Sequence, residues 1–320
     1  MKVLVTGSSG HLGEALVRSL REDAAVDVIG LDVLASPFTD VVGSITDRAV
    51  VARCMAGVGA VLHAATLHKP HVATHRRQDF IDVNLTGTLT LLEEAVSAGV
   101  GAFVFTSTTS TFGDALTPPP ASPAAWITED VVPRPKNIYG ATKTAAEDLC
   151  QLFARNHGLP CVVLRTSRFF PEADDDPRRR DHYDDLNLKT SEFLYRRVDI
   201  EDVVGAHLRA MAAAPGLRFD KFIVSATTPF TQADLAQVRV DPAAVLRRRV
   251  PAFEAVYAAR GWKMLADIDR IYVNERARTV LGWTPQYDFE RNLRELAAGR
   301  DPRSALAHVV GSKGYHAAMA

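Results

Sequence analysis

The sequence predicts an α/β fold in which a parallel sheet is covered by helices on both faces. Three observations point to it. The chain opens with an apolar run that breaks into spaced glycines before a helix, the second apolar run ends at an aspartate, and further apolar runs alternate with helical patterns. Strands that are joined by helical crossovers are parallel, and their carboxyl ends meet at one edge, where ligands bind in such folds.

The opening stretch carries the strongest local signal. Residues 3–5 are an apolar run typical of a buried strand, and Gly7, Gly10 and Gly13 follow at three-residue spacing before a helix that starts near His11. In such a unit the glycines allow a tight turn, close backbone approach to a pyrophosphate, and close packing of helix on strand. The stretch therefore predicts a Rossmann-type dinucleotide site, although a glycine triplet alone also fits a flexible turn.

Asp32 ends the second apolar run at the offset from the glycines where a carboxylate meets the adenosine ribose hydroxyls. This carboxylate would repel a 2′-phosphate, and no basic residue follows it until Arg48. We therefore expect NAD rather than NADP. The alternative is that Asp32 only starts a turn.

The remaining elements follow in order. Only eight residues separate Asp32 from the short run 41–42, too few for a full crossover helix. The pattern then predicts a helix over 46–55, a strand over 58–63 and a long helix that ends near Gly99. A strand over 102–106, a helix over 138–157 and a strand over 160–165 follow, and the last of these is expected to complete the sheet.

Two segments interrupt this pattern. The Pro-rich stretch 116–135 predicts either a structured lid or a plain connection, and the charge-rich stretch 172–189 favours a solvated loop over a metal or substrate site. Residues 193–213 are expected to return to strand and helix, 222–225 to form a short strand, and the rest to be mainly helical. We expect a dinucleotide-binding domain over 1–168, to which 196–226 return, and a smaller substrate-binding lobe from 169–195 and 227–320.

Composition limits the function classes. The 320 residues are 47% hydrophobic, and 37 basic residues nearly balance 38 acidic ones, which gives no support for nucleic-acid or membrane-surface binding. No apolar run reaches the roughly 18 residues of a membrane span, so we expect a cytoplasmic protein. Cys54, Cys150 and Cys161 lack metal or redox spacing, which predicts buried thiols in a reducing compartment.

The candidate chemistry lies at Tyr139 and Lys143, which are four residues apart and therefore share one face of a helix. An adjacent ammonium and an oxidised nicotinamide both favour a phenolate, so Tyr139 could accept the proton of a hydroxyl while hydride leaves the carbon. Y-x-x-x-K also occurs on ordinary helix faces. Five hydroxyl side chains at 107–111 directly follow the strand predicted over 102–106. One of them can steady the reacting oxygen, whereas most are expected to cap turns.

Several further motifs occur in a characteristic order: TGSSGHLG, HAAT at 63–66, NLTGT at 84–88, FVFTSTTSTFG, YGATK, DIEDVVGAH and LGWTPQYDFE. With these motifs the chain resembles the extended short-chain dehydrogenase/reductases, the NAD-dependent epimerase/dehydratase family, over nearly its whole length. The resemblance implies that Tyr139 is the acid/base, that Lys143 lowers its pKa and binds the nicotinamide ribose, and that Thr108 is the catalytic hydroxyl. The residues that it implies for NAD binding are Gly7, Gly10, His11, Leu12, Gly13, Asp32, Ser44, Ile45, Ala64, Ala65, Thr66, Asn84, Thr106, Tyr139 and Lys143.

Departures from the family pattern bear on the substrate. Thr108 is followed by Thr109 and Ser110 rather than an acidic pair, which disfavours dehydration. The chain reads LRTSR where epimerases resemble LRYFN, so Arg168 replaces an asparagine. Arg168 could bind a phosphate or carboxylate, or it could pair with an acid of 172–185. The predicted substrate residues are His68, Thr108, Thr109 and Arg168.

No metal site is expected, because His63, His68, His71 and His75 lack ligand spacing with a carboxylate partner. Three functions remain open at this point. We slightly favour hydride chemistry on the carbinol of a nucleotide sugar, with epimerisation as the result. The alternatives are a net dehydrogenase of a free sugar or uronate and a non-catalytic NAD-binding sensor or scaffold. The resemblance also implies a homodimer formed by helices near 78–98 and 138–157.

Overall fold

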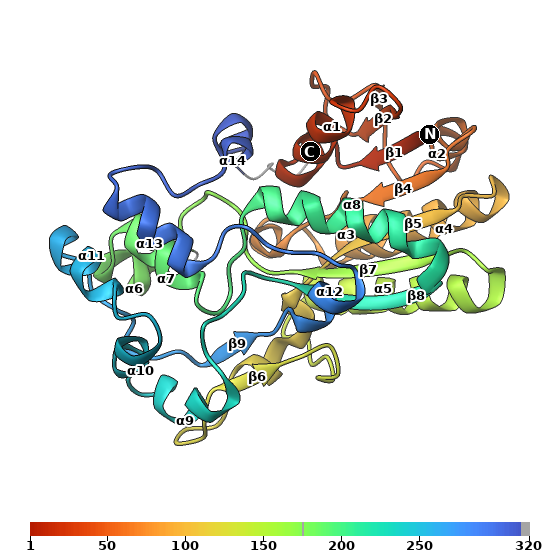
Figure 1. Ribbon diagram of the computed structural model, residues 1–320. Helices are drawn as coiled ribbons and strands as arrows, with labels where there is room; N and C mark the ends of the chain where they lie inside the picture. Colours follow the sequence, from red (N-terminus) through yellow and green to blue (C-terminus); the bar gives the residue numbers. More distant parts are fainter. Residues whose placement is uncertain (175, 315–320) are drawn as a thin grey trace.

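A seven-stranded parallel sheet forms the centre of the protein, in a computed structural model that describes residues 1–174 and 176–314 (Figure 1). The strand order is β3-β2-β1-β4-β5-β7-β8, and every neighbouring pair is parallel. The predicted α/β class with a doubly wound sheet is therefore confirmed. The strands are β1 (Lys2–Thr6), β2 (Asp27–Asp32), β3 (Val41–Val42), β4 (Ala60–His63), β5 (Ala102–Thr108), β7 (Cys161–Thr166) and β8 (Phe219–Val224).

The strand order reverses between β1 and β4. From β1 the chain proceeds outward to β2 and β3, and it then returns to pair β4 with the other side of β1, where Leu4 lies in register with both Ile29 and Val61. Ligands of open α/β sheets bind in the crevice beyond the strand ends at such a reversal. The topology thus places the binding site beyond the carboxyl ends of β1 and β4.

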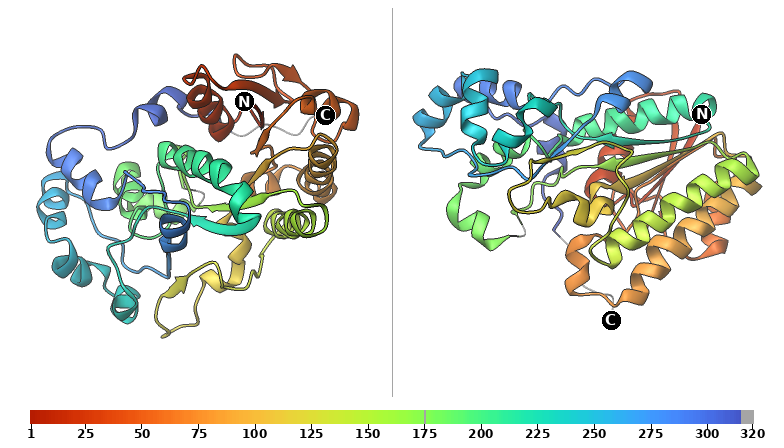
Figure 2. Two further views of the ribbon diagram at one scale, coloured as in Figure 1. Left: turned by 45° about the vertical axis from the view of Figure 1, so that its right-hand side comes forward. Right: turned by 90° about the horizontal axis from the view of Figure 1, so that it is seen from below.

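Helices cover both faces of the sheet (Figure 2). Alternate side chains of the central strands belong to the cores on opposite faces. Val3 and Val5 of β1 belong to the core on one face, whereas Leu4 belongs to the core on the other face. The helices of the two layers are α1 (His11–Arg21), α8 (Ile200–Leu217) and α14 (Ala305–Val310) on one side, and α2 (Arg48–Met55), α4 (Gly87–Ser97) and α5 (Ile138–His157) on the other. Cys54, Cys150 and Cys161 are buried thiols in the second core.

Two local predictions hold with small changes. No helix separates β2 from β3, as the short connection requires. The long helix that was expected to end near Gly99 is divided into α3 (Arg77–Phe80), a π-helical stretch over Ile81–Thr86 and α4.

The prediction that the strand over 160–165 completes the sheet is wrong, because β8 pairs in parallel with β7 and adds a seventh strand. The expected strand near 193 is also absent: Arg197 makes only an isolated bridge to Arg168 before α8 begins. Both errors have one cause. The 26 residues between Arg168 and Tyr195 include few apolar residues, so the hydrophobic pattern did not indicate where the chain rejoins the sheet.

A separate hydrophobic core underlies the second lobe, which is built from segments that are distant in the sequence. Strand β6 (Ala125–Ile127) lies within the Pro-rich stretch and pairs in parallel with β9 (Arg270–Tyr272). The Pro-rich stretch is therefore part of the framework of the second lobe. The charge-rich stretch is not a plain solvated loop, since it contains α6 and most of α7, and Asp174 is buried. The lobe helices are α6 (Pro177–His182), α7 (Asp185–Glu192), α9 (Leu235–Val238), α10 (Pro242–Arg249), α11 (Phe253–Arg260) and α13 (Phe289–Ala297). Helix α12 (Glu275–Val280) instead contacts β8, and its Ala277 belongs to the core of the main sheet.

Within residues 1–174 and 176–314, no helix combines the length and the apolar character that a bilayer crossing requires.

Candidate active site

The glycine turn between β1 and α1 leaves no room for side chains at two positions. Gly7 has φ +73°, and a Cβ there would lie 2.7 Å from the backbone nitrogen of Ala65. A Cβ on Gly13 would lie 1.8 Å from the carbonyl oxygen of Gly7. The turn therefore packs closely on β4 and on the first turn of α1, whose N–H groups have no partner within the helix. This arrangement fits a pyrophosphate.

Asp32 at the end of β2 is tied to this turn. Its Oδ2 accepts a hydrogen bond of 2.9 Å from the backbone N–H of Ser9, and its Oδ1 accepts one of the same length from that of Leu34. The carboxylate is thus fixed at the carboxyl end of the sheet beside the glycines. An adenosine ribose placed there would meet an acceptor and a negative charge, which fits NAD better than NADP.

A cavity of about 760 Å³ begins at the glycine turn and extends past β4 and β5 to Tyr139. Most of the predicted site residues line it. They are Gly7, Gly10, His11, Leu12, Gly13, Asp32, Ser44, Ile45, Ala64, Ala65, Thr66, His68, Thr106 and Tyr139. The other five predicted site residues are not in its lining, namely Asn84, Thr108, Thr109, Lys143 and Arg168.

Tyr139 lies in the first turn of α5, which begins where the Asn137 side chain accepts a 3.0 Å hydrogen bond from the N–H of Gly140. Burial raises the pKa of the Tyr139 phenol to about 12, whereas a hydrogen bond with the Thr108 hydroxyl acts to lower it. Thr108 also accepts a hydrogen bond from the N–H of Ser110 and so caps the turn after β5. The structure therefore brings the phenol and the predicted catalytic hydroxyl into direct contact.

Lys143 lies one helical turn further along α5 and is buried. Its ammonium is 4.0 Å from the centre of the Phe105 ring. Burial lowers the pKa of Lys143 to about 7, against the smaller opposing effects of Cys150 and Glu147. Among the described groups Thr108 is the one that lowers the pKa of Tyr139, so activation of Tyr139 by Lys143 stays a prediction.

Behind Lys143 a buried ionic network joins helix α5 to the sheet. Glu147 is fully buried, and both of its oxygens accept hydrogen bonds from the Arg165 guanidinium at 2.7–3.2 Å. The Ser107 hydroxyl donates to Glu147 at 2.6 Å, and the Lys221 ammonium lies 3.3 Å from it. These contacts fix α5, and with it Tyr139 and Lys143, relative to β5, β7 and β8.

Asn84 acts behind the cavity wall. Its Oδ1 accepts hydrogen bonds from the Thr66 hydroxyl at 2.9 Å and the Leu67 N–H at 2.8 Å, and its Nδ2 donates to the Leu67 carbonyl and the Thr142 hydroxyl. The side chain thus braces the segment after β4, which does line the cavity. Cofactor contact by Asn84 itself stays a prediction.

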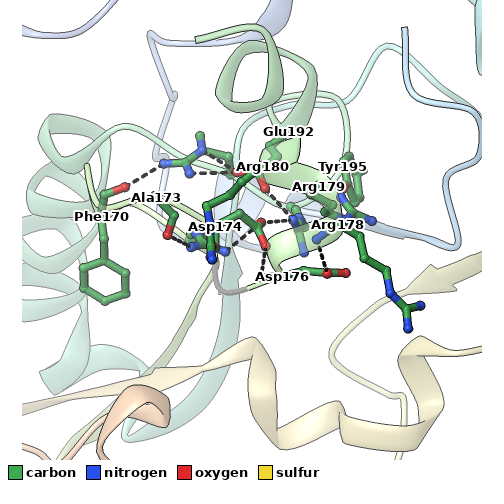
Figure 3. A network of polar contacts seen from close by, with 12 residues as sticks. Phe170, Ala173, Asp174, Asp176, Arg178, Arg179, Arg180, Glu192 and Tyr195 are labelled. Atoms are coloured by element: carbon green, nitrogen blue, oxygen red, sulfur yellow. Dashed lines mark hydrogen bonds and ion pairs between the residues drawn. The ribbon is translucent and has the colours of Figure 1, made fainter. Parts of the chain in front are cut away.

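Arg168 faces a network of charges in the second lobe, of which Figure 3 gives a close view. Its guanidinium lies 3.1 Å from Asp174 and donates to the Ala173 carbonyl at 3.0 Å. Asp174 also pairs with Arg196 at 2.6 Å, and the buried Glu192 pairs with Arg197 at 2.7 Å. Of the two roles considered for Arg168, the structure shows the pairing with an acid of 172–185. A role in substrate binding stays a prediction.

The histidines in and after β4 make contacts with neighbouring side chains. His63 is buried between Thr6 and Thr88, with ring nitrogens 2.7 and 2.9 Å from their hydroxyls. His68 and His71 lie together, with ring centres 5.6 Å apart, and both line the cavity. Within the described part of the chain no group of three or more His, Cys, Asp or Glu side chains is arranged to hold a metal ion.

Several residues of the cavity lining were not predicted, among them Phe169, Phe170, Lys313 and Gly314. The Phe170 ring lies edge-on to His11 and to His68, with centroid distances of 5.5 and 5.8 Å. The two aromatic residues follow β7 directly, so the rule that ligands gather after parallel strands could have identified them. No local pattern identifies Lys313, which reaches the site from the far end of the chain.

A family model described as the NAD dependent epimerase/dehydratase family matches residues 3–221. The chain belongs to this family. Its cofactor is NAD, as the glycine turn and Asp32 predicted, and the expectation of an enzyme of the extended short-chain dehydrogenase/reductase type is confirmed at the level of the family.

Individual curated proteins resemble the chain to differing extents. A UDP-glucose 4-epimerase of Lactobacillus helveticus is 25% identical over 90% of this chain and 93% of its own. An L-arabinose 1-dehydrogenase (NAD(P)(+)) of Haloferax volcanii is 27% identical over 67% of this chain and 78% of its own. Other curated relatives match only about half of this chain. The matched region covers 39% of the length of one of these relatives and 57% of the length of another.

The fold is shared with solved members of the superfamily. One of them is a short-chain dehydrogenase/reductase superfamily protein of Agrobacterium tumefaciens with bound NAD, which is 25% identical to this chain and superposes with a TM-score of 0.65. The match covers 93% of this chain and 96% of that protein.

Proposed function

We propose that the protein is an NAD-dependent oxidoreductase that acts on the carbinol of a sugar, with Tyr139 as the acid/base. One observation carries the proposal. The cavity that begins at the glycine turn and Asp32 ends at a buried phenol in hydrogen-bond contact with the Thr108 hydroxyl. Such an arrangement allows proton transfer at a position shielded from water.

Bound NAD supplies the hydride acceptor for the carbinol carbon. The Tyr139 oxygen takes the proton from the substrate hydroxyl as the carbon–oxygen double bond forms, and returns it when a ketone is reduced. Thr108 holds the reacting oxygens by hydrogen bonding. Burial alone keeps the Tyr139 phenol protonated, so the step depends on positive charge from a protonated Lys143 and from the oxidised nicotinamide.

For the substrate we propose first a nucleotide sugar, whose carbinol is oxidised and then reduced again with the opposite stereochemistry. The similarity to a UDP-glucose 4-epimerase over nearly the whole chain supports this function. The absence of an acidic pair after Thr108 is against dehydration as the outcome.

A second candidate is the net oxidation of a free sugar or uronate. The observation in its favour is the pairing of Arg168, Arg196 and Arg197 with Asp174 and Glu192, which leaves these guanidinium groups less available to a diphosphate. The similarity to an L-arabinose 1-dehydrogenase also supports it.

The test is a panel of nucleotide sugars, uronates and free sugars, incubated with the protein and NAD. Absorbance of NADH reports net oxidation, and product stereochemistry reports epimerisation with no change of the cofactor spectrum. If the protein binds NAD but no compound gives either signal, the proposal of catalysis fails and the sensor or scaffold interpretation replaces it.

We also propose a homodimer, in which the α3–α4 region and α5 of two subunits pack together, and a cytoplasmic location. Light scattering coupled to size-exclusion chromatography tests the first of these. A mass near that of one 34.8 kDa chain would contradict it.

A further inference from the structure

A short segment near the C-terminus, residues 311–314, reaches the dinucleotide end of the cavity. It follows α14, which packs against α1 and α8. Lys313 and Gly314 line the same cavity as Gly10 and His11, and the backbone nitrogen of Lys313 lies 3.0 Å from Nε2 of His11. The segment therefore lies against the first turn of α1, where the pyrophosphate of a dinucleotide binds.

Glu172 holds this segment in place. Its Oε1 accepts hydrogen bonds from the Ser312 hydroxyl at 2.8 Å and from the N–H groups of Lys313 and Gly314 at 3.2 Å, and it lies 2.9 Å from Nε2 of His11. Burial alone would raise the pKa of Glu172, but the hydrogen bonds with His11 and Ser312 hold it at about 2. Glu172 therefore carries a full negative charge at neutral pH.

A second carboxylate lies close by. Glu14 is in the first turn of α1 and only 3% exposed, and it forms an ion pair with the Lys313 ammonium as well as one of 2.7 Å with Arg18. Two carboxylates near one helix N-terminus oppose the binding of a diphosphate, which carries two negative charges. The Lys313 ammonium is the positive charge by which residues 311–314 partly offset these two carboxylates.

We propose that residues 311–314 form a strap that completes the dinucleotide site, with Glu172 as its anchor and Lys313 as the cation that offsets Glu14 beside the diphosphate. The inference rests on the NAD site and does not depend on the sugar that is oxidised. Because coupling between two binding events is reciprocal, a strap that raises affinity for NAD is itself stabilised by NAD.

Binding measurements with Lys313→Gln test the electrostatic part. We expect about tenfold weaker binding of NADH and of ADP-ribose, and adenosine binding within twofold of wild type, because only the first two ligands contain a diphosphate. The double variant Glu14→Gln/Lys313→Gln should recover most of the loss, since it removes the carboxylate that Lys313 offsets. Arg300→Gln is the matched control, because it removes the same charge from an exposed pair with Glu295.

Two results would overturn the electrostatic part. One is unchanged affinity for NADH and ADP-ribose in a Lys313→Gln protein that melts at the wild-type temperature. The other is an equal loss for adenosine, which would mean that the substitution disturbs the site generally. Since no turnover is measured, failure of these tests is distinct from failure of the proposed sugar chemistry.

Hydrogen exchange of the wild-type protein tests the strap directly. We expect NAD to slow exchange of the Lys313 and Gly314 amides, and Glu172→Gln to speed their exchange and the release of bound NADH by about tenfold. If saturating NAD leaves the exchange of these two amides unchanged, the segment is not part of the dinucleotide site.

Discussion

The Lys143 ammonium lies 4.0 Å from the centre of the Phe105 ring, and both side chains are buried beside the cavity. The ring face stabilises a cation, but burial still lowers the pKa of Lys143 to about 7, well below its ordinary value of 10.5. Above pH 7 the folded protein therefore releases this proton before the unfolded chain does.

This difference predicts how stability depends on pH. Between about pH 7 and 10 the unfolded chain binds more protons at Lys143, so the free energy of unfolding should rise with pH by about 1.4 kcal/mol per unit relative to Lys143→Met. Urea titrations of both proteins across this range measure the difference. Curves that remain parallel would show that Lys143 keeps its proton in the folded protein.

Tyr139 and Thr108 should have separable effects on turnover. Tyr139→Phe removes the proton acceptor, so kcat should fall by about 10²–10⁴-fold while the NADH dissociation constant changes by less than about threefold. Thr108→Val removes the hydrogen bond that lowers the pKa of Tyr139. The oxidation rate, which increases with pH as Tyr139 loses its proton, should therefore increase at a higher pH in this variant. Thr144→Val, which loses a hydroxyl bonded to the Gly140 carbonyl on the same helix, is the control. Full activity of Tyr139→Phe would exclude the assigned role.

Asp32 should determine the choice between NAD and NADP. Asp32→Asn keeps the shape of the side chain but removes the charge that repels a 2′-phosphate, so the preference for NADH over NADPH should fall at least about tenfold. Dissociation constants from the fluorescence of the two reduced cofactors give the ratio. Asp27→Asn, at the exposed start of the same strand, should leave the ratio unchanged. An unaltered ratio in Asp32→Asn would place the discrimination elsewhere.

The glycine turn should tolerate no side chain at Gly13. An added Cβ would lie 1.8 Å from the Gly7 carbonyl oxygen, so Gly13→Ala should cost about 3 kcal/mol or more of unfolding free energy and abolish NAD binding. At Gly216 in α8 no atom lies within 4 Å of the added Cβ, and Gly216→Ala should gain up to about 1 kcal/mol. Denaturant titrations compare the two variants. Similar stability in both would contradict the close packing of the turn.

The first half of the fold was predictable because its signals are local. Val3 to Gly13 specify strand, turn and helix by spacing alone, and Asp32 lies at the offset that the fold requires. The position of Tyr139 and Lys143 on one helix was predictable for the same reason, since residues four apart share one helix face.

The remaining features depend on contacts that a local pattern does not contain. Arg168 could bind an anion or an internal acid, and only the folded structure shows Asp174 beside it. The burial that moves the pKa values of Tyr139 and Lys143 in opposite directions is likewise a property of packing. Similarly, β8 pairs with β7 because helix α8 returns the chain to the edge of the sheet. The few apolar residues of 172–189 gave no indication that a seventh strand would follow.

The ion pair between Glu14 and Lys313 joins residues that are 299 positions apart. During synthesis all seven strands of the sheet, the last of which ends at Val224, leave the ribosome well before Lys313 does. A growing chain therefore presents its glycine turn without these contacts for many seconds, until the segment that contains Lys313 emerges.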